Sequence, residues 1–181
     1  MALSSLFKNG MIMSALLSIG CVSATADEIG QKTAEARPAA LREKELDAFW
    51  AEVSRSVREG DFEGYSATCH PEGVLVSGSS RTSYPLSRAL VRWKQGILDT
   101  KSGAIKASVE FRFGQRLGDE TTAHETGIFR YMTEKDGEVS VFLIHLEALL
   151  VKKDQRWQAL MEYQKSEASE EEWEAIKSPL I

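Results

Sequence analysis

The hydrophobic residues of the chain are densest between residues 139 and 165. The runs 141–144 and 146–151 are almost wholly apolar, so a strand through them has apolar side chains on both faces. The four polar residues at 153–156, Lys-Asp-Gln-Arg, are typical of a tight turn. The pattern predicts two long antiparallel strands, joined by this turn, in a sheet that is covered on both sides.

Four ionisable side chains interrupt these two predicted strands. His145 and Glu147 share one face of the first strand, because side chains alternate with a period of two. Glu162 and Tyr163 lie near the end of the second strand, on opposite faces if that strand is regular. We expect the floor of any functional site in this part of the chain.

Helical spacing marks the segments ahead of the strands. From residue 41, apolar side chains recur at every third or fourth position as far as Gly60, which predicts an amphipathic helix of about five turns. Asp61 is placed to cap a short second helix that ends before Pro71. Pro85 is well placed to open a third helix. The buried stripe of this third helix consists of Leu86, Leu90, Trp93 and Ile97.

Shorter signals complete the predicted order of elements. Residues 74–76 predict a strand, residues 77–83 predict a loop, and apolar and polar residues alternate through 105–113. Gly118-Asp119 and Asp136-Gly137 fit two-residue hairpin turns. Helices followed by an antiparallel meander give an α+β fold, in which N-terminal helices pack on a strongly curved sheet and form a cone with an internal pocket.

The chain ends in a predicted short helix and tail at 169–181. Ser169 and Glu172 have the spacing of a capping box, in which each residue bonds the other's backbone. Trp173 is the side chain expected to dock this helix on the body of the protein.

Length, charge and cysteine content narrow the class of protein. The 181 residues suit one domain, 43% of them are hydrophobic, and the net charge is −5. An acidic chain without a Lys/Arg run, a glycine-rich phosphate loop or zinc-type Cys and His spacing is not expected to bind nucleic acid, metal or another cofactor.

The N-terminus has the features of an exported protein. Lys8, a short apolar run at 11–19 and the small residues Ala24-Thr25-Ala26 predict a signal peptide over residues 1–26, and hence a periplasmic or secreted protein. The competing interpretation is lipid anchoring at Cys21. Residues 27–42 are interpreted as a linker, and after cleavage no membrane span and no intramolecular disulfide are expected.

Three motifs resemble those of the SnoaL-like, nuclear-transport-factor-2-like superfamily, whose members include ketosteroid isomerase. They are Glu59-Gly60-Asp61-Phe62 leading into Glu72-Gly73-Val74-Leu75-Val76, Gly118-Asp119-Glu120-Thr121-Thr122-Ala123 with Thr126-Gly127, and Asp154-Gln155-Arg156-Trp157-Gln158-Ala159-Leu160. The resemblance implies a cone-shaped α+β domain over residues 43–168. It also implies a homodimer formed through the outer face of the sheet.

The candidate chemistry is proton transfer by a carboxylate in an apolar cone. Glu147 is the first candidate for the base, with His145 as its partner and Tyr163 or Tyr65 as a hydrogen-bond donor; Glu162 is the competing acid. The expected pocket residues are Tyr65, Trp93, His145, Glu147 and Tyr163. The structural alternative is that Glu147 and Glu162 pair with Arg112, Arg130 or Lys165 across the sheet. His124 and Glu125 are expected to face solvent.

Two functional hypotheses follow. The first is a noncatalytic module that binds a small apolar ligand or serves as a dimeric accessory domain. The alternative is an isomerase, dehydratase or hydrolase that acts on a hydrophobic substrate by acid-base catalysis without a cofactor. The two differ in where the side chains of His145, Glu147, Glu162 and Tyr163 point.

Overall fold

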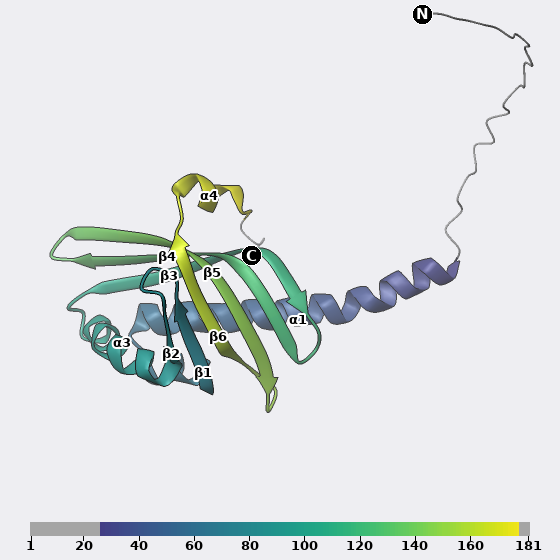
Figure 1. Ribbon diagram of the computed structural model, residues 1–181, viewed down its shortest axis with the longest axis horizontal. Coiled ribbons are helices and arrows are strands. Elements are labelled where there is room, and N and C mark those ends of the chain that lie inside the picture. Colours follow the sequence, from purple (N-terminus) through teal and green to yellow (C-terminus); the bar gives the residue numbers. More distant parts are fainter. Residues whose placement is uncertain (1–25, 178–181) are drawn as a thin grey trace, which may run out of the picture.

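The structure, a computed structural model, describes residues 26–177, with side chains of the first helix described from residue 39. The elements are α1 (Ala26–Glu59), α2 (Phe62–Ala67), β1 (Cys69–Ser77), β2 (Thr82–Pro85), α3 (Leu86–Lys101), β3 (Lys106–Gly118), β4 (Thr122–Lys135), β5 (Glu138–Lys153), β6 (Arg156–Glu167) and α4 (Glu170–Ala175). Helices followed by a long meander confirm the predicted α+β class (Figure 1).

The six strands form one curved sheet in the order β2-β1-β6-β5-β4-β3. Strands β3 to β6 pair antiparallel as successive hairpins, and β1 joins β6 in parallel. Helix α1 lies on the concave face, where the Trp50 ring packs against Phe111 and Phe113 of β3. Helix α3 covers the same face beside β1, so the helices and the sheet enclose a cone.

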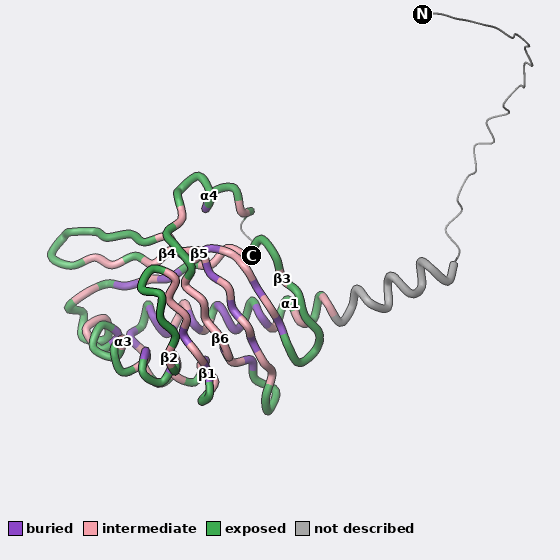
Figure 2. Tube along the Cα trace, viewed as in Figure 1, coloured by how far each residue is buried: buried purple, intermediate pink, exposed green. Residues whose placement is uncertain are grey.

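The core lies between these helices and the concave face, where the buried residues gather along α1 and the central strands (Figure 2). Alternation along β5 explains this placement, because Leu146, Ala148 and Leu150 are at most 2% exposed and all point inward. Helix α3 contributes Leu86, Ala89 and Ile97 to the buried set.

Two of the three predicted hairpin turns are confirmed in detail. The central residues of both two-residue turns have positive φ: 53° at Asp136, 84° at Gly137, 49° at Asp154 and 61° at Gln155. This is the backbone twist that suits a tight β-hairpin. The turn after Gly118 is longer than predicted, because the Asp119 carboxylate accepts hydrogen bonds from the backbone of Thr121 and Thr122.

The predicted C-terminal helix is also confirmed. Ser169 and Glu172 form the capping box, and Trp173 is 1% exposed. The Arg112 guanidinium lies 4.3 Å from the centre of the Trp173 ring and donates a hydrogen bond to its carbonyl. Helix α4 therefore docks on the outer face of the sheet.

The structure differs from the sequence predictions at two segments. Helix α1 begins at Ala26, so residues 27–42, interpreted as a linker, lie within it; the segment is rich in Ala, Glu, Lys and Arg, which favour helix. The predicted loop at 77–83 instead runs into β2, which pairs with β1. The signal peptide prediction lies outside the described residues except for Ala26. No helix within residues 26–177 is long and apolar enough to cross a membrane.

Candidate functional site

A cavity of about 480 Å³ lies between α1, α3 and the concave face of the sheet. Its walls are mainly apolar and come from all three N-terminal helices and from five strands, β1, β3, β4, β5 and β6. The aromatic lining residues are Phe49, Trp50, Tyr65, Trp93, Phe111, Phe129, Tyr131 and Phe142. A space of this size with such walls is suited to a small apolar molecule.

Small side chains on the sheet leave room for this cavity. Ala148 of β5 and Ala159 of β6 line it, and Ala148 lies directly opposite Glu162 across the β5–β6 ladder. Because a methyl group fills little of the space above a strand, the Glu162 carboxyl has open volume beside it.

Glu162 is the acid of the cavity. Burial raises the pKa of its carboxyl above the usual 4.5, and the hydrogen bond donated by Gln164 Nε2 to Glu162 Oε1, 2.7 Å long, acts in the opposite direction. The removal of water therefore outweighs the one neutral donor that supports the charge.

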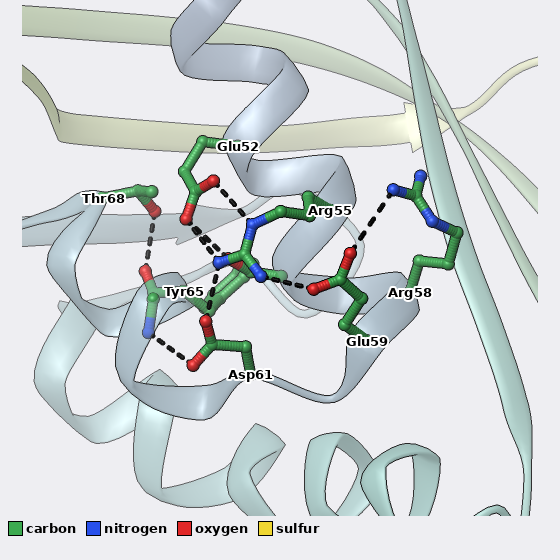
Figure 3. Close-up of polar contacts among 9 residues, drawn as sticks. Glu52, Arg55, Arg58, Glu59, Asp61, Tyr65 and Thr68 are labelled. Carbon is green, nitrogen blue, oxygen red and sulfur yellow. Dashed lines mark hydrogen bonds and ion pairs between the residues drawn. The ribbon is translucent and has the colours of Figure 1, made fainter.

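Tyr65 enters the cavity from α2, whose position is fixed by the corner that follows α1 (Figure 3). Arg55 donates hydrogen bonds to Glu52, Glu59 and Asp61, and Asp61 in turn caps α2 through the Gly64 amide at 2.9 Å. Burial and then the charge of Glu162 raise the pKa of the Tyr65 phenol well above 10. Tyr65 is thus a neutral hydrogen-bond donor within the electrostatic reach of Glu162.

Cys69 also lines the cavity. Burial, with a smaller contribution from the nearby Glu162, raises the pKa of its thiol to about 12. A thiol with such a pKa is protonated at neutral pH and is not a nucleophile.

The opening of the cavity lies between α3 and β5. Arg92 and Gly96 of α3 are exposed lining residues, and Phe142 of β5 is 51% exposed. Arg92 Nη1 donates to the Tyr84 hydroxyl at 2.8 Å, which holds the guanidinium at the rim.

The placement of the predicted pocket residues requires a correction. Tyr65 and Trp93 line the cavity, but His145, Glu147 and Tyr163 do not. Because Leu146 and Ala148 point inward, the alternation of β5 turns His145 and Glu147 to the outer face. Tyr163 is paired with Glu147 in the ladder and points outward with it.

On the outer face these residues already have partners. Lys165 Nζ lies 2.7 Å from Glu147 Oε1, as the structural alternative predicted, and His145 Nε2 lies 3.3 Å from Glu172 Oε1 of α4. They border an open hollow next to Ile176. Arg112 and Arg130 pair with Glu174 and Glu170 of α4 instead of with Glu162.

Glu125 is a second correction, because it is fully buried and not exposed to solvent as predicted. Its carboxylate accepts hydrogen bonds from Trp50 Nε1 and Arg116 Nε, and Arg116 also pairs with Asp47. Glu125 shares the inward face of β4 with Phe129 and Tyr131, and this alternation is the signal that locates it.

The arrangement can hold an apolar molecule and place one carboxyl group against it. Among the side chains of residues 39–177, no three His, Cys, Asp or Glu groups gather as metal ligands. The groups of the cavity that could act on a bound molecule include the Glu162 carboxyl and the Tyr65 hydroxyl, beside the aromatic walls.

Comparison with known proteins identifies a family to which this sequence is similar. The family of calcium/calmodulin-dependent protein kinase II association domains matches the sequence over residues 42–169. A comparison with curated protein sequences found no significant match.

Three solved structures illustrate the shared fold. A conserved protein from Planctomyces limnophilus has a TM-score of 0.59 at 12% identity, covering 68% of this chain and 94% of that one. An NTF-2-like protein of unknown function from Shewanella oneidensis has a TM-score of 0.53 at 15% identity, covering 67% and 97%. A ketosteroid isomerase-like protein from Erwinia carotovora has a TM-score of 0.52 at 15% identity, covering 70% and 95%.

Identities this low establish the fold and not the activity. The family match spans most of the chain, and it agrees with the resemblance to nuclear-transport-factor-2-like proteins. The chain therefore belongs to the calcium/calmodulin-dependent protein kinase II association domain family, within the nuclear-transport-factor-2-like superfamily.

Proposed function

We propose that the protein binds a small, mostly apolar molecule in the cavity of its cone. The observation that carries this proposal is the cavity itself, about 480 Å³ with aromatic walls and a single carboxyl group. Ligand sites of roughly 300–1,000 Å³ with apolar walls and a few polar groups are the common type in proteins.

Native mass spectrometry of protein purified from the cells that produce it tests this proposal. Gly96→Phe is the blocking variant, because Gly96 lines the cavity and a Cβ atom there meets nothing within 4 Å. Val91→Phe is the matched control, since Val91 lies on the same helix, is 76% exposed and does not line the cavity.

The expected result is an added small-molecule mass on the wild type and on Val91→Phe, and its absence from Gly96→Phe. A bound molecule that survives Gly96→Phe would show that the ligand lies elsewhere. A wild-type protein without any added mass would also count against the proposal.

A second candidate function, acid-base catalysis, is favoured by the raised pKa of Glu162. Burial moves this carboxyl toward the pKa range of a general base, and Tyr65 is a neutral donor near it. Glu162 would then be the base, for which the sequence makes Glu147 the first candidate. Glu162→Gln should abolish turnover of a hydrophobic substrate while Glu147→Gln retains it; the reverse result would refute the assignment.

Self-association through the outer face is the proposed second property of the domain. Apolar side chains remain exposed there near the tip of the β4–β5 hairpin, at Met132, Val139 and Val141. The name of the matched family describes association domains, which supports assembly of this chain into at least a homodimer.

Export to the periplasm or the exterior remains the proposed localisation, with lipid anchoring at Cys21 as the alternative. Its basis is the apolar run and the small-residue site within residues 1–26. Intact mass and N-terminal sequencing of the cellular protein should give a chain that begins at Asp27. An N-terminus at Met1 would exclude cleavage.

A further inference from the structure

Glu162 lacks a cationic partner within the described part of the chain. Its carboxyl accepts a hydrogen bond from the neutral amide of Gln164, and the ion pairs of residues 39–177 do not include it. The basic side chain that lines the cavity, Arg92, is exposed at the rim and bonded to Tyr84. Glu162 is partly buried, and a carboxylate withdrawn from water is normally paired with a positive charge. A bound molecule could supply the positive partner that this carboxylate lacks.

The aromatic walls around this carboxyl would also attract a positively charged molecule. Tyr65 and Trp93 meet edge to face, with ring centres 6.0 Å apart, and Phe129 and Tyr131 of β4 line the same cavity. The negative face of an aromatic ring attracts an organic cation, most strongly where water is excluded.

We propose that the cavity selects a molecule with a protonated amine on an apolar body, whose ammonium group binds the Glu162 carboxylate while the body packs against the aromatic walls. This inference rests on the proposed ligand-binding function and specifies its ligand class. A neutral ligand would leave the carboxylate unpaired, and an acid would bring a second negative charge next to it.

The pH dependence of binding follows from the groups that face Glu162. Tyr65 and Cys69 stay neutral well past neutral pH, because burial raises the pKa of both, and the Tyr131 phenol is shifted the same way. Glu162 is thus the wall group that changes charge as pH rises from acid. Amine affinity should increase as pH passes the raised pKa of Glu162, and should fall again above the pKa of the amine itself.

Isothermal titration calorimetry with three probes of one shape tests the inference. The probes are 4-phenylbutylamine, 4-phenylbutanol and 4-phenylbutyrate, which share an apolar body and differ in the charge of one end. At pH 8 we expect the wild type to bind the amine about ten-fold or more tightly than the alcohol, and the butyrate most weakly.

Glu162→Gln is the matched variant, because it keeps the shape of the side chain and removes the charge. It should erase the preference for the amine while the affinity for the alcohol stays within about two-fold. Circular dichroism at pH 8 checks that this variant is folded.

The outcomes separate the two proposals. An alcohol that binds the wild type as tightly as the amine, or an amine preference that survives in Glu162→Gln, would overturn the amine inference and leave cavity binding standing. Absence of binding by all three probes, or equal binding by Gly96→Phe, would overturn the cavity proposal and the inference with it.

Discussion

The Glu162 carboxyl makes the stability of the fold depend on pH. Burial raises its pKa above 4.5, so between the unfolded and folded values the unfolded chain has lost a proton that the folded protein keeps. The contribution of this group to stability therefore falls as pH rises through that window. We expect Glu162→Gln to have a higher melting temperature than the wild type at pH 8, and the same melting temperature as the wild type at pH 4. A wild type that melts above the variant at pH 8 would contradict this assignment.

Glu125 differs from Glu162, because its buried carboxylate is paired with the Arg116 guanidinium. Glu125→Ala removes the partner of Arg116 and the acceptor of the Trp50 indole, and should lower the free energy of unfolding by about 3 kcal/mol. Glu125→Gln keeps an acceptor and should cost less. In urea unfolding, Glu120→Ala at an exposed position serves as the control, expected within about 0.5 kcal/mol of wild type. Equal losses for Glu125→Ala and Glu120→Ala would show that the pair is not stabilising.

At the residue scale, period-two alternation predicted which side chains share a face, but not which face is the inner one. His145 and Glu147 do lie together, and Glu162 and Tyr163 do lie on opposite sides. The choice of face could not be made because β5 is apolar on both, and only the packing of α1 and α3 decides it.

At the scale of elements, the β5–β6 turn places two non-glycine residues at positive φ. Gln155 has φ of 61°, a conformation that costs a side-chain-bearing residue about 1 kcal/mol and glycine almost nothing. After the extra chain entropy of glycine, Gln155→Gly should raise the free energy of unfolding by about 0.5 kcal/mol. Gln95→Gly in α3 is the contrasting control and should lower it by about 1 kcal/mol. Chemical denaturation that ranks the two variants in reverse order would contradict this explanation.

Elements determined by a few neighbouring residues could be predicted from the sequence, and elements that depend on tertiary contacts could not. The turn at Asp136-Gly137 and the capping box of Ser169 each depend on a few adjacent residues. Strand β2 consists of Thr, Ser, Tyr and Pro, and forms because β1 offers it an edge. That edge belongs to the assembled sheet, so a pattern along the chain does not reveal it.

At the scale of the whole molecule, α4 covers only part of the outer face. It lies over the row formed by Arg112, Ile128 and His145, and it leaves the tip of the β4–β5 hairpin open (Figure 1). The proposed self-association would use the exposed apolar residues of this hairpin, among them Val139 and Val141. Val141→Glu should convert the assembly to monomers in analytical ultracentrifugation, because it places a charge within an apolar contact.

Leu98→Glu is the matched control for this prediction. Leu98 is 38% exposed, close to the 41% of Val141, but it lies on α3 away from the outer face. It should leave the assembly intact. A wild-type monomer, or dissociation by both variants, would contradict assembly through the hairpin.

The fold of the whole molecule could be predicted from the sequence. Of the cavity, its presence could be predicted, but not its size or the carboxyl group within it. The order of helices and strands, together with three short motifs, identified the cone. The size of the cavity and its carboxyl depend on where small residues such as Ala148 and Ala159 meet across strands. Such pairings follow from strand register, which the sequence constrains only through its turns.

The most direct test of the ligand site is a crystal structure of the protein with 4-phenylbutylamine. We expect the phenyl ring among the aromatic walls near Trp93, and the nitrogen within hydrogen-bonding distance of the Glu162 carboxylate. A probe found instead in the outer hollow beside Glu147, with the cone empty, would contradict it.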